Sequence, residues 1–67
     1  MRFLKVKDKD GRTVLIKIAN ISAIWQDGEN TIISVMQPNE YITIKVPIEQ
    51  VEKTINAYFQ GWIIAIR

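Results

Sequence analysis

The side chains that most often carry acid–base, nucleophilic and metal chemistry are missing, because the chain has neither histidine nor cysteine. Disulfide bonds and zinc sites built from these side chains are excluded on the same ground. Carboxylates come close together at Asp8 and Asp10, before Gly11, and at Glu49 and Glu52. The first pair lacks the later bidentate glutamate of a calcium loop and is typical of a hairpin turn, whereas the second is typical of a helix start. We therefore expect no enzyme, no metal and no cofactor, but a protein that works by binding.

Positive charge is concentrated in the first seventeen residues, against a net charge of only +2 for the whole chain. A basic segment can face an anionic partner, although solvated hairpin side chains give the same pattern. Basic side chains contact phosphates, and aromatic ones on the same face stack on bases. The pattern predicts a nucleic-acid interface made of Lys5, Lys7, Arg12, Lys17, Asn39, Tyr41 and Lys45.

Two of the polar and aromatic residues have a second interpretation. Asn39 follows Pro38, so a role in the turn is as consistent with the sequence as a hydrogen bond to a base edge. Trp25 precedes the turn at Asp27 and is a further stacking candidate, but indole rings are mostly buried. We therefore expect Trp25 to pack in the core.

Alternating apolar and polar residues predict five strands, at residues 2–7, 12–18, 21–26, 31–36 and 41–46. Turn residues separate them at Asp10-Gly11, Asp27-Gly28 and Pro38-Asn39, and residues 19–20 form a short break. The alternation places five side-chain pairs or triplets on common faces: Leu4 and Val6; Val14, Ile16 and Ile18; Ile21, Ala23 and Trp25; Ile42, Ile44 and Val46 inward; and Tyr41, Thr43 and Lys45 outward.

After the strands the apolar period changes to that of a helix. Pro47 suits the first helical position, and an apolar stripe follows at Ile48, Val51, Ile55, Tyr58 and Trp62. Gly61 is a natural stop, so residues 62–66 are a candidate for a sixth, short strand. The alternative is a helix that continues through Gly61, at a cost of about 1 kcal/mol relative to alanine.

Sixty-seven residues make one domain, and nearly half of them are apolar. A domain this small without crosslinks has little interior, so some apolar side chains should face another subunit. We expect a homo-oligomer whose interface includes Trp62, Ile63, Ile64 and Ile66. The start of the chain has no signal-peptide core and its longest apolar run is too short for a bilayer, which favours a cytoplasmic protein.

Five short strands joined by tight turns leave exposed edges unless the sheet curls into a small barrel or pairs between subunits. The fold class predicted is therefore mainly β: a strongly bent, five-stranded antiparallel barrel with a C-terminal amphipathic helix. The stretches MRFLKVKDKDGRTVLIKIANISAIWQDGENTIISVM and YITIKVPIEQVEKTINAYF resemble the Sm-like (LSm) small-barrel family, and a family of short marine proteins of apparent cyanophage origin.

The resemblance implies a homomeric ring that binds RNA or single-stranded DNA, with pore-facing loops at residues 19–20 and 37–40. The sequence departs from the family in lacking the acid-plus-Asn pair and the Arg-Gly of the Sm motifs, and in placing its helix after the strands. A second resemblance, to small flagellar-operon proteins, rests on Ile48-Glu49-Gln50-Val51 after a strand–turn–strand unit. It implies a protein-interaction or regulatory module instead.

Overall fold

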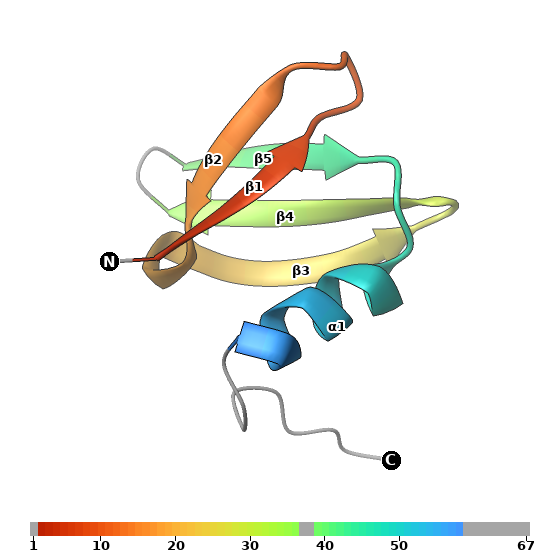
Figure 1. Cartoon of the computed structure of the whole chain (residues 1–67). Coiled ribbons are helices and arrows are strands. Elements are labelled where there is room, and N and C mark those ends of the chain that lie inside the picture. Colours follow the sequence, from red (N-terminus) through yellow and green to blue (C-terminus); the bar gives the residue numbers. More distant parts are fainter. Residues whose placement is uncertain (1, 37–38, 59–67) are drawn as a thin grey trace.

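The computed structural model describes residues 2–36 and 39–58. Within them the chain forms antiparallel strands followed by one helix (Figure 1). The elements are β1 (Phe3–Lys7), β2 (Thr13–Lys17), the 3-10 helix η1 (Ile18–Asn20), β3 (Ile21–Asp27), β4 (Asn30–Met36), β5 (Asn39–Ile44) and α1 (Ile48–Tyr58). The mainly β class and the position of the helix are as the sequence predicts.

The tight turns form where Asp-Gly pairs predict them. Gly11 and Gly28 have φ of 82° and 60°, the left-handed region that other residues enter only with strain. Strand bounds differ most at β5, which begins at Asn39 and ends at Ile44. The prediction of a loop at Asn39 is therefore wrong: this residue pairs with Met36 of β4. Residues 45 and 46, predicted as strand, lie in the connection to α1.

The strands described here divide into two sheets rather than one. β1 pairs with β2, and β4 lies between β3 and β5 in a three-stranded sheet. Figure 1 shows the β1–β2 hairpin inclined across this second sheet, with α1 beside β3. One backbone hydrogen bond, from Lys9 N–H to Thr43 C=O at 2.8 Å, joins the hairpin to β5. The registers thus confirm antiparallel pairing and leave a closed barrel unconfirmed.

A β-bulge in β3 overturns the predicted common face of Ile21, Ala23 and Trp25. Ile21 pairs with Val35 and Ala23 with Ser34, so that Ser22 is an extra residue on this strand. A bulge shifts the alternation that follows it by one residue. Ile21 therefore faces the core, whereas Trp25 is 39% exposed on the outer face, and the prediction of a buried Trp25 is wrong.

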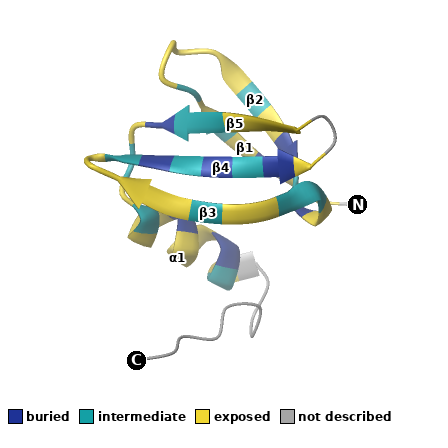
Figure 2. Cartoon of the chain, turned by 180° about the vertical axis from the view of Figure 1, so that it is seen from behind, coloured by how far each residue is buried: buried dark blue, intermediate teal, exposed yellow. Residues whose placement is uncertain are grey.

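The core lies between the two sheets and α1. Leu4 and Ile16 come from the hairpin, Ile33 and Ile44 from the three-stranded sheet, and Val51 from α1. Figure 2 shows the corresponding alternation of buried and less buried residues along β4. Ile33 is fully buried and Ile44 nearly so. The predicted alternation of inward and outward side chains in β1, β2 and β5 is thus confirmed, as is the first part of the apolar stripe along the helix.

Two side-chain hydrogen bonds fix the start of α1 to the sheet. Gln26 Oε1 accepts from Ile48 N–H at 2.8 Å, while its Nε2 donates to Gly28 C=O at 2.7 Å. The buried Thr31 donates from Oγ1 to Val46 C=O at 2.6 Å. Because the first N–H groups of a helix lack partners within it, Gln26 acts as a cap supplied from β3. Some predicted features lie outside the residues that the structure describes. They are the side chain of Tyr58, the sixth strand predicted at 62–66 and the predicted interface residues Trp62, Ile63, Ile64 and Ile66.

Candidate nucleic-acid interface

The outer face of the β1–β2 hairpin carries the clearest candidate site. Leu4 and Val6 turn toward the core, so their neighbours in β1 must face outward. The register pairs those neighbours with outward residues of β2. The face consists of Phe3 opposite Lys17, Lys5 opposite Leu15, and Lys7 opposite Thr13. We call these six residues the hairpin face.

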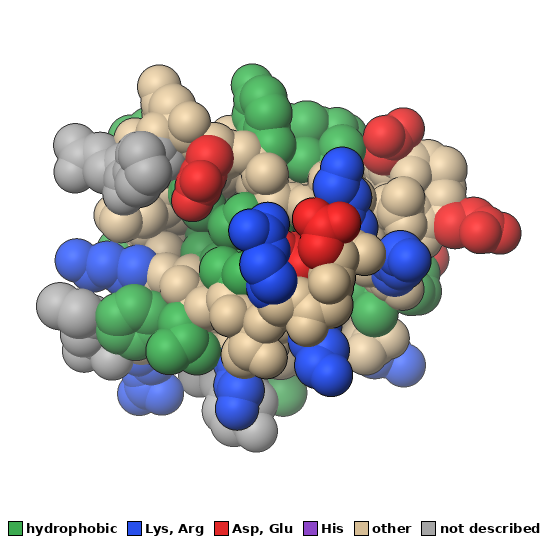
Figure 3. Space-filling view, turned by 90° about the horizontal axis from the view of Figure 1, so that it is seen from above, with side chains coloured by type: hydrophobic (Ala, Val, Ile, Leu, Met, Phe, Trp, Pro, Cys, Tyr) green, Lys and Arg blue, Asp and Glu red, His purple; other side chains and the backbone are tan. Residues whose placement is uncertain are grey.

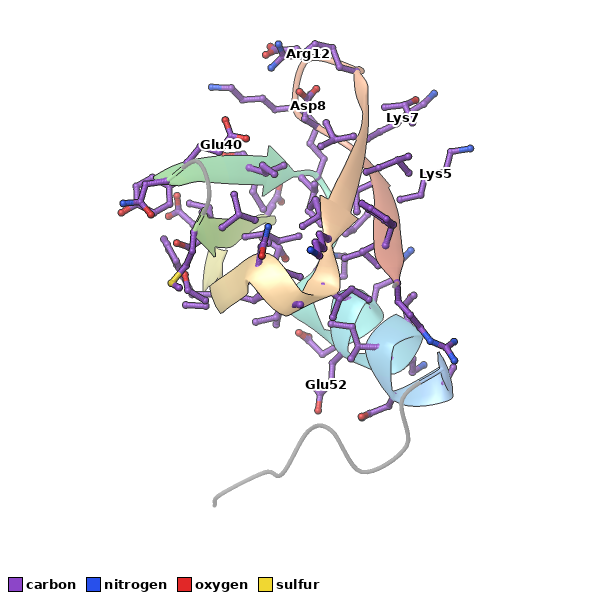
Figure 4. All side chains as sticks on the ribbon, turned by 90° about the vertical axis from the view of Figure 1, so that its left-hand side faces the viewer. Lys5, Lys7, Asp8, Arg12, Glu40 and Glu52 are labelled. Carbon is purple, nitrogen blue, oxygen red and sulfur yellow. The ribbon has the colours of Figure 1, made fainter. Side chains whose placement is uncertain are left out.

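The hairpin face combines three lysines with exposed apolar surface and contains no acidic residue. Phe3 is 51% exposed and Leu15 is 62% exposed. Directly opposite pairs in antiparallel strands have Cβ atoms about 5 Å apart, so the side chains of Phe3 and Lys17 leave the hairpin as neighbours. Figure 4 shows Lys5 and Lys7 extending to the same side, away from Glu40 on β5. Such a face can hold phosphates at its cations and a base against its ring.

Part of the surface carries basic side chains without acidic ones. In the space-filling view from above, the lower border shows Lys and Arg side chains alone, whereas the centre and upper half show acidic and basic side chains together (Figure 3). No ion pair within the described part of the chain involves Lys5, Lys7 or Lys17. These cations are therefore available to an anionic partner.

Arg12, also predicted to bind nucleic acid, is engaged at the hairpin tip instead. Its Nε lies 2.8 Å from Asp8 Oδ2, and its Nη2 lies 3.7 Å from Asp10 Oδ2. The same Asp8 accepts backbone N–H hydrogen bonds from Arg12 at 2.9 Å and from Asp10 at 3.0 Å. Partial burial raises the pKa of Asp8, but these hydrogen bonds and the guanidinium charge outweigh it and hold the pKa below its ordinary value. Arg12 therefore shapes the turn.

Lys45 lines a groove with a volume of about 460 Å³, together with Lys5 and Lys7 of the hairpin face and with Asp8. The groove also includes Lys9 of the hairpin tip. Residues from β1, from the connection after β5 and from α1 line it. Lys45 therefore adds charge beside the hairpin face, whereas Asn39, at the far end of β5, does not belong to it.

Tyr41 lies on a different surface. It is 72% exposed on the outer face of the three-stranded sheet, where its ring meets that of Trp25 edge-to-face with centroids 5.7 Å apart. The register places Ala23, Trp25, Ile32, Ser34, Tyr41 and Thr43 on this outer face, without a cation. The sequence therefore combined two surfaces into one predicted site. Ala19 and Asn20, the first predicted pore loop, lie in η1, between β2 and β3.

Sequence reasoning assigned no role to Leu15, Gln26 or Thr31. Leu15 alternates with Ile16 and could have been placed beside Lys5 once the hairpin register was known. The hydrogen bonds from Ile48 to Gln26 and from Thr31 to Val46 join residues more than ten positions apart, and no local pattern indicates them.

Comparison with protein-family models, curated proteins and solved structures finds no match to this chain. Within residues 2–36 and 39–58 no group of three or more acidic side chains is placed to hold a metal ion. The helix in this part of the chain is too short to cross a membrane. The interpretation of function rests on the geometry of the two surfaces.

Proposed function

We propose that this protein binds single-stranded nucleic acid, RNA or DNA, through the hairpin face. The single observation that carries the proposal is that Lys5, Lys7 and Lys17 share one face of the hairpin with the exposed Phe3, with no acidic residue among them. Phosphates contact the lysines, and a base stacks on Phe3, which contributes about 1–3 kcal/mol per base in proteins of this kind. Such contacts carry little sequence preference, since every base has a stacking surface.

A single strand fits this face better than a duplex does. A two-stranded hairpin face is only about two residues across, and its aromatic ring needs an unpaired base to stack on. Lys45 and Lys9, along the adjoining groove, continue the positive surface beyond the strand pair. Arg12 contributes little, because Asp8 and Asp10 already offset its charge.

Self-association into a homomeric ring is the second part of the proposal. Three lysines make a small site, but copies in a ring act together and can raise avidity by about 10² to 10⁴. In this proposal the two sheets are the halves of a strongly bent, Sm-like barrel. Its support is the antiparallel pairing and the hydrogen bond from Lys9 to Thr43, which links the halves at one end.

Fluorescence anisotropy with labelled oligo-U and oligo-dT of equal length, at low salt, tests the binding. The wild type should bind both, and Lys5→Gln should weaken binding by about fivefold at 0.1 M salt, the contribution of one phosphate contact. Lys53→Gln is the matched control, because it removes the same charge from an exposed position on α1. Absence of binding by the wild type, or equal effects of the two substitutions, would refute the proposal.

A protein-interaction module is the second candidate, favoured by the outer face of the three-stranded sheet. Trp25 and Tyr41 are exposed there beside Ile32, and the residues that β3, β4 and β5 place on that face include no lysine or arginine; Lys9 and Arg12 of the hairpin tip approach it only at Tyr41 and Thr43. Exposed aromatic surface without cations suits a polypeptide better than phosphates. Binding that survives loss of all hairpin lysines but not Trp25→Ala would favour this function.

A further inference from the structure

We propose that residues 62–66 of a second copy add as a strand to the free edge of β1, in the groove beside α1. The inference rests on the self-association part of the proposed function and names its interface.

The groove runs along the edge of β1. Residues 4–9 all line it, both Leu4 and Val6, which face inward, and Lys5 and Lys7, which face outward. A hollow over one face of the strand would meet only alternate residues. The other walls are formed by Ile44 at the end of β5, by Lys45 and Val46 after it, and by Gln50, Val51 and Thr54 on α1.

The edge that faces this groove has unused backbone groups. Strand β1 is hydrogen-bonded to β2 alone, and within the described residues no backbone hydrogen bond joins residues 3–7 to β5 or α1. A strand edge with free N–H and C=O groups is a template for another strand. The floor is apolar, with Leu4, Val6, Ile44, Val46 and Val51. An apolar, extended segment satisfies both requirements.

Residues 62–66, Trp-Ile-Ile-Ala-Ile, have this character and match the five-residue length of β1. In an added strand, alternation puts Trp62, Ile64 and Ile66 on the apolar floor. Ile63, Ala65 and Arg67 then fall on the side of Lys5 and Lys7. The donated strand would thus bring Arg67 to the hairpin face of its neighbour, which ties assembly to nucleic-acid binding.

The donor is a second copy because α1 leads away from the groove. Gln50, Val51 and Thr54 line it from the first two turns, and the helix continues one further turn to Tyr58. To enter the same groove, the chain would have to reverse and cross within residues 59–61, which span at most about 11 Å. A neighbour has no such constraint, and repeated head-to-tail donation closes into a ring when the rotation between copies allows it.

Paired substitutions test the register by light scattering on the full chain. Ile64→Asp would bury a carboxylate on the apolar floor and is expected to reduce the assembly to single chains. Ala65→Asp, one position along, points outward and is expected to leave the mass unchanged. A wild type with the mass of one chain would overturn self-association itself. An assembly that responds equally to both substitutions would overturn only the strand donation.

Thiol crosslinking then identifies the donor chain, since the protein has no cysteine of its own. A Val46→Cys sample mixed with an Ile64→Cys sample should give a disulfide-linked dimer on oxidation, because the donated strand would bring position 64 to the floor beside Val46 and a disulfide needs Cα atoms within about 7 Å. An Ala65→Cys sample should give several-fold less. If the double variant Val46→Cys/Ile64→Cys runs only as a crosslinked monomer, the strand is donated within one chain and the inference is wrong.

Discussion

The salt dependence of binding offers a quantitative test of the hairpin face. Replacing Lys5, Lys7 and Lys17 together by glutamine removes three cations that face one side of β1 and β2. For single-stranded nucleic acid, the logarithm of the association constant falls with the logarithm of salt by about 0.7 per phosphate contact. The triple variant should therefore have a slope shallower by about 2 and, at 0.1 M salt, an affinity lower by about 10².

The assay is a set of anisotropy titrations of oligo-dT at salt concentrations from about 0.05 to about 0.3 M. In this range the release of condensed counterions dominates the salt dependence of the association constant. The control is Lys53→Glu with Asn56→Asp on α1, because both variants change the net charge from +2 to −1. The control should retain the wild-type slope within about 0.5, since counterion release follows local contacts rather than net charge. Equal slopes for the triple variant and the control would refute the reasoning.

Three further predictions concern stability. Gln26→Ala removes the hydrogen bond to Ile48 N–H and should lower the free energy of unfolding by about 1 kcal/mol, measured by urea titration; an unchanged midpoint would show that the cap has no energetic role. Because the folded-state pKa of Asp8 is lowered, its stabilisation is present above the ordinary value of 3.8 and is lost as pH falls through the folded-state value. Asp8→Asn should flatten that part of a stability profile measured from pH 6 to 2, and identical profiles would contradict it. Ile33→Ala should cost about 2–5 kcal/mol in thermal or urea unfolding, since Ile33 is fully buried, and a loss below 1 kcal/mol would mean that the core is misplaced.

The strands and turns could be predicted from the sequence because the conformation of each depends mainly on residues that are neighbours in the chain. Alternation identifies β1 and β2 and orients Leu4, Ile16 and Lys5 correctly. Asp-Gly pairs predict the turns at Gly11 and Gly28, where φ is positive. The helix follows from apolar spacing after Pro47.

Features that depend on contacts between distant parts of the chain could not be predicted from the sequence. The bulge at Ser22 reverses the faces of β3 after it and exposes Trp25, although nothing in the local composition marks it. The division into two sheets depends on which strand edges pair in the folded chain, and the sequence pattern does not show this. For that reason the predicted nucleic-acid site divides as well: Lys5 and Lys7 lie on the hairpin, whereas Tyr41 lies on the other sheet.

The central claim is that nucleic acid contacts the hairpin face and not the aromatic face of the other sheet. Amide chemical shifts of the ¹⁵N-labelled protein, followed during titration with oligo-dT, test this claim most directly. The account predicts that the largest shifts fall in β1 and β2, around Phe3, Lys5 and Lys17, with little change at Trp25 and Tyr41. Shifts centred on Trp25 and Tyr41, with β1 and β2 unaffected, would contradict it.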